Sequence, residues 1–179
     1  QNRLNSYRLR VSNADLLLDI VRLGIIPNKK KILKFPNVPD KYLKHFIRGF
    51  LDGDGWIVTR IRKNGGKEIC VGFSNGSYYF MKELIKVIER FLGIKKFNLR
   101  KRTKITKNNK LAVTYQLEFY SVNAHRMIQF LYWNLNKNDI FLRRKYEKAL
   151  YAERLFKAQE KMKEFGRKWG GLEIKHNES

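Results

Sequence analysis

The sequence is poor in cysteine, histidine and proline. Its one cysteine, Cys70, cannot form an internal disulfide, and its three histidines do not lie at zinc-finger spacing. A disulfide-stapled secreted scaffold is therefore excluded. With only three prolines and no Gly/Ser-rich linker, the chain is expected to be compact from about Tyr7 to about Tyr151.

Long apolar runs are absent as well. None approaches the roughly 20 residues that a membrane-spanning helix needs. Residues 1–10 are polar and lack the apolar stretch of a signal peptide. We therefore expect a soluble, intracellular protein that does not cross a membrane.

Acidic residues are few relative to basic ones. Lys and Arg number 39, Asp and Glu 16, and the net charge is +23 at pH 7. Such an excess repels itself unless a polyanion neutralises it, so nucleic acid is the first expected partner and an anionic membrane surface the second. The alternative to a polyanion partner is that the positive charge only keeps the protein soluble. Apolar residues make up 43% of the chain, enough for the core of one domain, so disorder is not expected.

The hydrophobic periodicity predicts the element order αββαββα, followed by a tail. The main signals are apolar residues at helical spacing, alternation in the strands, and glycine or asparagine at the turns. The predicted elements are a strand at 7–11, a helix from Ser12 or Asn13 to Gly24, a helix from Asp40 to 53–55, strands at 56–62 and 67–74 around the turn 64–66, a helix from 74–77 to Gly93, strands at 97–105 and 111–119, a helix at about 123–133, and a charged helix from about 139 toward 165.

A weak internal repeat bears on the domain organisation. The segment at 7–14 resembles the segment at 115–124, and an apolar helix and an Asn/Lys-rich connector follow each. Residues 1–34 are therefore expected to be a strand-helix remnant of a preceding repeat, or an N-terminal arm. Residues 35–150 form the main unit, and residues 151–179 form a basic helical tail.

The segment Ile47–Gly55 is the most informative one. Gly49 and Gly53 lie one helical turn apart, and each costs about 1 kcal/mol in helix propensity. Close approach of a second helix would compensate for this cost. Asp54 follows at the helix C-terminus, where a carboxylate is disfavoured by roughly 0.3–1 kcal/mol.

Two such helices side by side would bring two carboxylates and the last backbone carbonyls together. That combination suits a hard divalent cation such as Mg²⁺, and a metal beside phosphate suggests phosphodiester hydrolysis. The plainer alternative is that Gly53 and Gly55 only end the helix, with Asp52 and Asp54 as turn residues.

Ile47–Gly55 resembles the motif of the LAGLIDADG homing endonucleases. Phe35-Pro36 and Pro39 before it and the αββαββα order after it extend the resemblance over about residues 7–150. It implies an α+β fold in which a LAGLIDADG αββαββα unit has a curved antiparallel DNA-binding sheet, helices on the opposite face, and a C-terminal helical tail. It also implies an intron- or intein-associated enzyme that cuts long double-stranded DNA sites, in an organelle (mitochondrion or chloroplast) or the cytoplasm of a prokaryote.

The resemblance also assigns roles within the motif. In the family the last acid binds the divalent metal and is catalytic, which matches Asp54, and the carbonyl before it helps, which matches Gly53. The expected cofactor is Mg²⁺, or another divalent cation such as Mn²⁺, or Ca²⁺ in a non-cleaving complex. The motif helices of two units form the central interface, which places Gly49, Gly53 and Phe50 there.

Two further family positions lie outside the motif. A polar residue at the end of the second strand contacts the water network, and its best match is Asn75, with Ser74 as the alternative. A basic residue after the final helix completes the site, and the resemblance places Lys145 in this role. Lys29 is its counterpart if residues 1–34 belong to a first repeat.

The outward strand positions and the hairpin tips are expected to contact DNA. Arginine can bind guanine edges in the major groove, and lysine can hold phosphate. The predicted DNA-binding residues are Arg60, Arg62, Lys63, Lys67, Arg100, Arg102, Lys104, Lys107, Gln116 and Lys29. Glu118 either reads a base or neutralises a neighbouring arginine.

The sequence contains one motif, whereas the chemistry needs two. Either the chain forms a homodimer, or its first repeat belongs to a missing N-terminal half. The expected function is a Mg²⁺-dependent, site-specific double-strand DNA endonuclease. The alternatives are an intron RNA maturase or a non-cleaving DNA-binding regulator on the same scaffold, and a basic structural RNA-binding protein in which the motif is coincidental.

Overall fold

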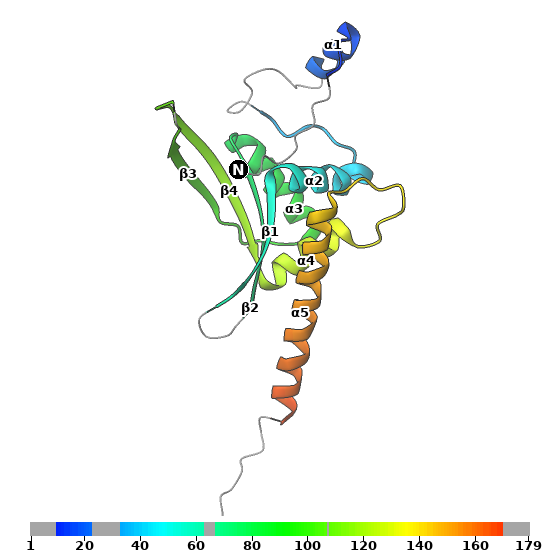
Figure 1. Cartoon of the computed structure of the whole chain (residues 1–179), viewed down its shortest axis with the longest axis vertical. Helices are drawn as coiled ribbons and strands as arrows, with labels where there is room; N and C mark the ends of the chain where they lie inside the picture. The colour runs from blue at the N-terminus through cyan, green and yellow to red at the C-terminus, as the bar shows by residue number, and fades with distance from the viewer. Residues whose placement is uncertain (1–9, 23–32, 63–66, 107, 170–179) are drawn as a thin grey trace, which may run out of the picture.

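The computed structural model describes residues 10–22, 33–62, 67–106 and 108–169, with side chains of the last helix described to residue 164. Figure 1 shows the arrangement of its helices and strands. The elements are α1 (Ala14–Arg22), α2 (Asp40–Asp54), β1 (Gly55–Ile61), β2 (Lys67–Asn75), α3 (Tyr78–Leu92), β3 (Leu99–Ile105), β4 (Leu111–Tyr120), α4 (Ser121–Tyr132) and α5 (Arg143–Trp169).

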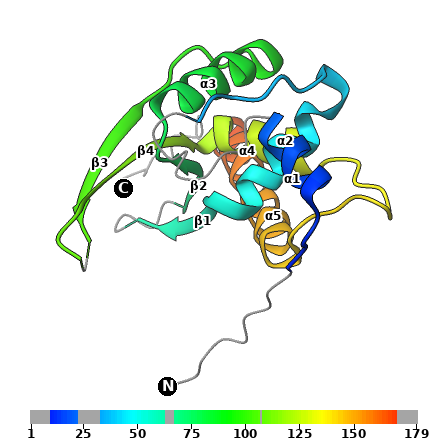
Figure 2. The same ribbon diagram turned by 90° about the horizontal axis from the view of Figure 1, so that it is seen from above.

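The four strands form one antiparallel sheet in the order β1-β2-β4-β3. Figure 2 shows the sheet bending, with α2, α3 and α4 against one face and none of the described helices on the other. From α2 to α4 the order is αββαββα, as predicted, and α5 follows as an additional helix. The predicted α+β fold, with a curved sheet and helices on the opposite face, is confirmed.

The core lies between the helices and the covered face of the sheet. Alternate strand residues such as Ile57, Phe73 and Leu117 are fully or almost fully buried there. The helices contribute residues at helical spacing, among them Leu51 and Met127. The alternation read from the sequence therefore places the apolar strand residues on the helix side and leaves the intervening positions for the outer face.

Local signals fix the ends of the two helices that frame the first hairpin. Ser77 caps α3, because its hydroxyl accepts a hydrogen bond from the Phe80 N–H at 3.3 Å. Gly93 ends α3 with φ of 60°, a conformation that glycine adopts without strain. α2 begins at Asp40 and ends at Asp54, as the sequence predicts.

The structure describes only part of the N-terminal segment for which a strand and a helix are predicted. Asn13 caps α1 by accepting a hydrogen bond from the Leu16 N–H at 2.8 Å, as expected, but α1 has no buried residue. The strand predicted at 7–11 lies largely outside the described residues, and residues 10–13 have no regular structure. The assignment of residues 1–34 to a preceding repeat stays a prediction.

α5 begins later than the sequence predicts and crosses the expected domain boundary at residue 150. Residues 133–142 form an irregular connection, because Asp139 accepts a hydrogen bond from the Asn136 N–H at 2.9 Å and lies against Arg48. Ala152 is buried, so the helix packs on the core beyond residue 150 before it extends past the sheet (Figure 1). In the described part of the chain, no helix is both long and apolar enough to cross a membrane.

Candidate active site and nucleic-acid interface

The motif helix passes directly into the first strand. α2 ends at Asp54 and β1 starts at Gly55, whose N–H donates to the Leu51 carbonyl. A side chain at Gly55 would meet the Gly72 carbonyl oxygen at 2.8 Å and also collide with Leu51. Glycine is therefore required here by close packing between the helix end and the sheet, and this packing fixes where Asp54 lies.

The two acids of the motif have different surroundings. Asp52 accepts hydrogen bonds from the Tyr132 hydroxyl at 2.9 Å and the Leu142 N–H at 2.8 Å. Burial and this carboxylate raise the pKa of Tyr132. Asp54 is exposed, and its carboxylate has no hydrogen bond or ion pair with any described residue. Asp52 therefore links α2 to α4 and to the connection after it, whereas the Asp54 carboxylate is available to bind a ligand.

Lys145 lies against the end of α2. Its side chain is 3% exposed, and its Nζ donates to the carbonyl oxygens of Asp52 at 2.8 Å, Gly55 at 2.6 Å, and Leu51. Burial and the neighbouring Arg144 lower the pKa of Lys145, whereas the carboxylates of Asp52 and Asp54 act in the opposite direction. The structure thus places Lys145 against the motif. Its ammonium binds backbone carbonyls there and not the carboxylates of the motif.

The end of β2 separates the two candidates for the polar position. The Ser74 hydroxyl donates to the Asp54 carbonyl at 3.1 Å and belongs to the outer face of the sheet. Asn75 lies on the opposite alternation, and its Oδ1 accepts the Ser77 N–H at 2.8 Å before α3. Contact with the motif favours Ser74, and the catalytic role assigned to Asn75 stays a prediction.

The exposed face of α2 is lined by glycine. Tyr42, His45, Gly49 and Gly53 share one helical face, and all are exposed. A Cβ added to either glycine would meet no atom within 4 Å. We call these four residues the glycine stripe. Phe50, the third residue predicted for the helix interface, instead packs on this chain's own Phe73 and Phe80 rings.

A second line of α2 residues, spaced by four, was missed by the sequence reasoning. Lys44, Arg48 and Asp52 all face α4 and the connection after it. Arg48 is 1% exposed and donates to the Leu131 carbonyl at 3.1 Å and the Ile140 carbonyl at 3.3 Å. Its guanidinium also lies 3.3 Å from Asp139. The i, i+4 spacing of Lys44, Arg48 and Asp52 along α2 was the available signal.

The outer face of the sheet is polar and basic at its two sides. Arg60 is on β1, and on β3 the outward side chains are Arg100, Arg102 and Lys104, as predicted. Their cross-strand neighbours, Gln116 included, are on the same face. The positions that share it are Trp56, Val58, Arg60, Glu68, Cys70, Gly72, Ser74, Thr114, Gln116, Glu118, Tyr120, Arg100, Arg102 and Lys104.

Several outer-face cations already have partners. Arg100 pairs with Glu118 at 3.4 Å, so Glu118 does neutralise an arginine. Arg102 donates to the Gln116 side-chain oxygen at 3.2 Å, and Arg62 binds Glu68. These contacts hold long side chains in place over the sheet.

The remaining residues predicted to contact DNA are not among those on the described outer face. Lys67 follows the alternation of the core residues, so it lies at the exposed end of β2 on the helix side. Lys29, Lys63 and Lys107 lie outside the described residues.

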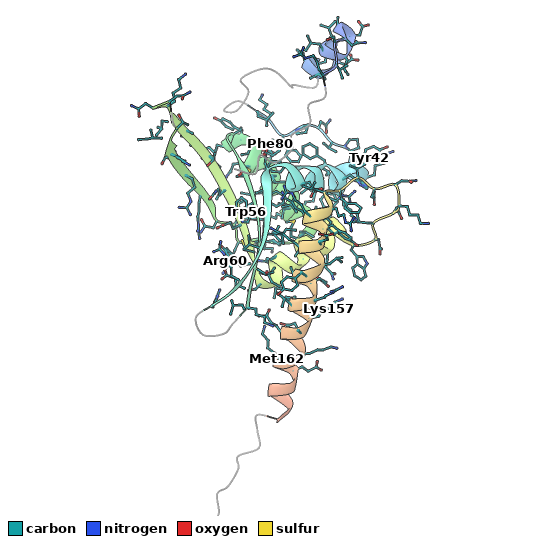
Figure 3. The ribbon with its side chains drawn as sticks, viewed as in Figure 1. Tyr42, Trp56, Arg60, Phe80, Lys157 and Met162 are labelled. Carbon is teal, nitrogen blue, oxygen red and sulfur yellow. The ribbon has the colours of Figure 1, made fainter. Side chains whose placement is uncertain are left out.

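The centre of the outer face is aromatic. The Trp56 ring lies across Gly72, where a Cβ would come within 2.7 Å of the indole nitrogen. The buried Cys70 thiol contacts the side chains of Trp56 and Tyr120. Burial and the hydrogen bond to Glu118 raise the pKa of Tyr120 to about 12, so it stays a neutral donor near pH 7. Trp56 and Arg60 follow one another along β1 (Figure 3).

Comparison with known proteins matches the part of the chain that contains α2 and the sheet. A family model described as a LAGLIDADG-like domain matches residues 41–130, half of the chain, from the first turn of α2 into α4. The crystal structure of the LAGLIDADG meganuclease I-AabMI bound to uncleaved DNA is similar, with 19% sequence identity and a TM-score of 0.40. This match covers 69% of the present chain and 40% of the meganuclease chain. A search of curated protein sequences finds no match. The chain belongs to the LAGLIDADG family.

Proposed function

We propose that the chain is one of the two LAGLIDADG units of a divalent-cation-dependent, site-specific double-strand DNA endonuclease. One observation carries this proposal: Asp54, exposed and with no hydrogen bond or ion pair from its carboxylate to a described residue, lies at the end of the glycine stripe. A carboxylate at a helix C-terminus opposes stability, and helical glycines do as well. Both features are explained if a second motif helix packs against this one.

The second unit would lie against the glycine stripe. Its source is a second copy of this chain or a preceding repeat. With two-fold or pseudo-two-fold packing of α2 on its counterpart, the same surface contacts itself. Where the two-fold axis runs along the helices, two acids equivalent to Asp54 would lie at the same end of the helix pair, beside the ends of both sheets.

The residues present suit a hard divalent cation such as Mg²⁺. The Asp54 carboxylate and the Gly53 carbonyl are oxygen donors, which Mg²⁺ prefers. Among the described residues, no three Asp, Glu, His or Cys side chains form a group that would hold a metal ion, so one unit offers part of a site. Such a cation supplies Lewis-acid stabilisation of the phosphate.

The outer face would bind the duplex. The major groove admits a two-stranded β-ribbon, and arginine reads guanine there through two hydrogen bonds. Arg100 and Arg102 are held over the sheet by Glu118 and Gln116, so less side-chain freedom is lost on binding. The aromatic centre around Trp56 offers apolar contact to bases, and Lys104 on the edge strand β3 can hold phosphate.

The direct test uses the purified chain and a library of duplexes with a randomised insert. With Mg²⁺ we expect double-strand cleavage of a small subset of inserts, and with EDTA no cleavage. The same subset should be bound in Ca²⁺ with a specificity ratio on the order of 10³ or more at physiological salt. Selective binding without cleavage in Mg²⁺ or Mn²⁺ would indicate a maturase or a regulator, and sequence-blind binding would overturn the proposal.

The glycine stripe gives a prediction in which stability and assembly change in opposite directions. Gly49→Ala should stabilise the isolated chain by roughly 0.5–1 kcal/mol, because the added methyl meets nothing and favours the helix. The same methyl should weaken packing of two motif helices by about 1–3 kcal/mol, or about 5- to 150-fold in association. Thermal unfolding and analytical ultracentrifugation with the selected duplex measure the two effects.

The matched control for Gly49→Ala is Lys86→Ala. Lys86 lies on the exposed surface of α3, and its ion pair with Glu83 is open to solvent, so neither stability nor assembly should change appreciably. Assembly unaffected by Gly49→Ala would show that the glycine stripe is not the interface.

A further inference from the structure

The side chain of Lys145 is unusual in its burial. Among the residues that the structure describes, it is the only buried lysine. It comes from the first turn of α5, 90 to 94 residues after the motif residues it contacts. A buried ammonium is costly unless its hydrogen bonds are satisfied. The position of Lys145 therefore calls for a specific role at the end of α2.

All three donors of the ammonium are occupied. A protonated lysine has three N–H groups, and Lys145 makes three hydrogen bonds, to the carbonyls of Leu51, Asp52 and Gly55. No N–H remains for a water molecule or a phosphate. This distinguishes Lys145 from a residue that would exchange protons with the reacting groups.

The three acceptors lie on both sides of the metal-binding positions. Leu51 and Asp52 precede Gly53 and Asp54 in the last turn of α2, and Gly55 follows them in β1. The carbonyl of Asp54 accepts from Ser74. Within the described residues, Lys145 and Ser74 thus bind the carbonyls around Gly53 and leave that of Gly53 itself to another ligand.

The ammonium also offsets the electrostatics of this helix end. The last carbonyls of a helix carry partial negative charge and lack partners in the helix. Asp52 and Asp54 add two carboxylates nearby. A fixed positive charge below the turn lowers the repulsion between these groups, so the turn can keep one geometry with and without a cation.

We propose that Lys145 is a positioning residue whose ammonium clamps the junction between α2 and β1, and so holds the Gly53 carbonyl and the Asp54 carboxylate in place for a divalent cation. The inference rests on the proposed function. It assigns Lys145 to cation affinity and not to proton transfer. Removing a group that orients metal ligands typically lowers metal affinity about 10- to 100-fold.

The test measures cation binding apart from cleavage. Calorimetric titration of Ca²⁺ into the full chain bound to its selected duplex should show about 10- to 100-fold weaker affinity for Lys145→Met. Single-turnover cleavage should need correspondingly more Mg²⁺, recover in large part when Mg²⁺ is saturating, and keep its pH profile. Lys161→Met, which removes an exposed lysine further along α5, is the control and should leave Ca²⁺ affinity unchanged.

Lys145→Arg provides a variant that keeps the charge if the methionine variant does not fold. A planar guanidinium cannot direct three donors to the converging carbonyls as an ammonium does, so Ca²⁺ affinity should again fall. Wild-type Ca²⁺ affinity in the arginine variant, or in a folded methionine variant, would overturn the positioning role. A changed pH profile at unchanged Ca²⁺ affinity would do the same. If the wild-type complex neither binds Ca²⁺ nor cleaves, it is the proposed function that fails.

Discussion

Asp54→Asn is expected to lower the cleavage rate by at least about 10³-fold, because loss of a metal-binding carboxylate removes several kcal/mol of transition-state stabilisation. DNA affinity should stay close to that of the wild type, since Asn has the same shape and Asp54 forms no ion pair with a described arginine. Single-turnover cleavage and equilibrium binding to the selected duplex measure the two quantities.

Stability should change little when Asp54 is neutralised. The Asp54 carboxylate has no hydrogen bond or ion pair within the described residues, and it lies at the negative end of the helix. Its neutralisation relieves a repulsion of roughly 0.3–1 kcal/mol but also removes its attraction for the Lys145 ammonium, so the free energy of unfolding should change by less than about 1 kcal/mol. A variant that cleaves at the wild-type rate, or one that is markedly less stable, would contradict the role given to Asp54.

Asp52→Asn is the matched control two residues away. The Asp52 carboxylate accepts hydrogen bonds from Tyr132 and Leu142, so this variant should lose about 1–3 kcal/mol of stability. Its folded fraction should still cleave DNA. The same chemical change at two positions of one motif thus separates a ligand from a structural residue.

Arg48→Met is expected to destabilise the chain by about 3 kcal/mol or more, as removal of one member of a buried charged network does. The substitution leaves the carbonyls of Leu131 and Ile140 without their donor and removes a cation from Asp139. For a chain of this size the melting temperature should fall by roughly 6–12 °C. Thermal and urea unfolding measure the change.

Acid unfolding provides a second measurement of the effect of Arg48→Met. The Asn136 N–H, Arg48 and His45 hold the pKa of Asp139 below its ordinary value. A lowered folded-state pKa means that the unfolded chain binds more protons as the pH falls. The stabilisation is present above the ordinary carboxyl pKa and is lost as the pH falls through the folded-state value. Arg48→Met should therefore weaken the loss of stability below about pH 4.

Lys44→Met tests whether the effect is specific to Arg48. Lys44 lies one turn earlier on the same side of α2, and its ammonium donates to the Trp133 carbonyl at 2.7 Å. Because Lys44 is only partly buried, its loss should cost about 1 kcal/mol. Equal losses for the two variants would show that burial of the guanidinium network contributes little.

Helix ends were predictable because the signals lie within a few residues of the ends they set. Ser77 and Gly93 frame α3, and the glycines of the motif end α2, as the sequence indicates. The roles of Asn75 and Ser74 were not separable in this way. Their assignment depends on which side of β2 faces the motif, and a shift of one residue reverses it.

Contacts between segments far apart in the chain could not be predicted from the sequence. Arg48 looks like one more charged residue of an exposed helix face, yet it is buried because the end of α4 and the connection after it bring carbonyls to it across more than 80 residues. Trp56 falls in the polar phase of β1, and only the pairing of β1 with β2 places Gly72 under its ring.

The sequence by itself determined the α+β order, the basic strand faces, and the motif with its disfavoured acid. These follow from periodicity, charge and local backbone preference. Only the tertiary structure decided that the Asp52 carboxylate is hydrogen-bonded within the chain and that of Asp54 is not, that Phe50 packs against the core and lies outside the glycine stripe, and that Lys145 binds three carbonyls. The reason is physical: what a polar side chain does depends on its burial and its partners, and segments far apart in the chain supply both.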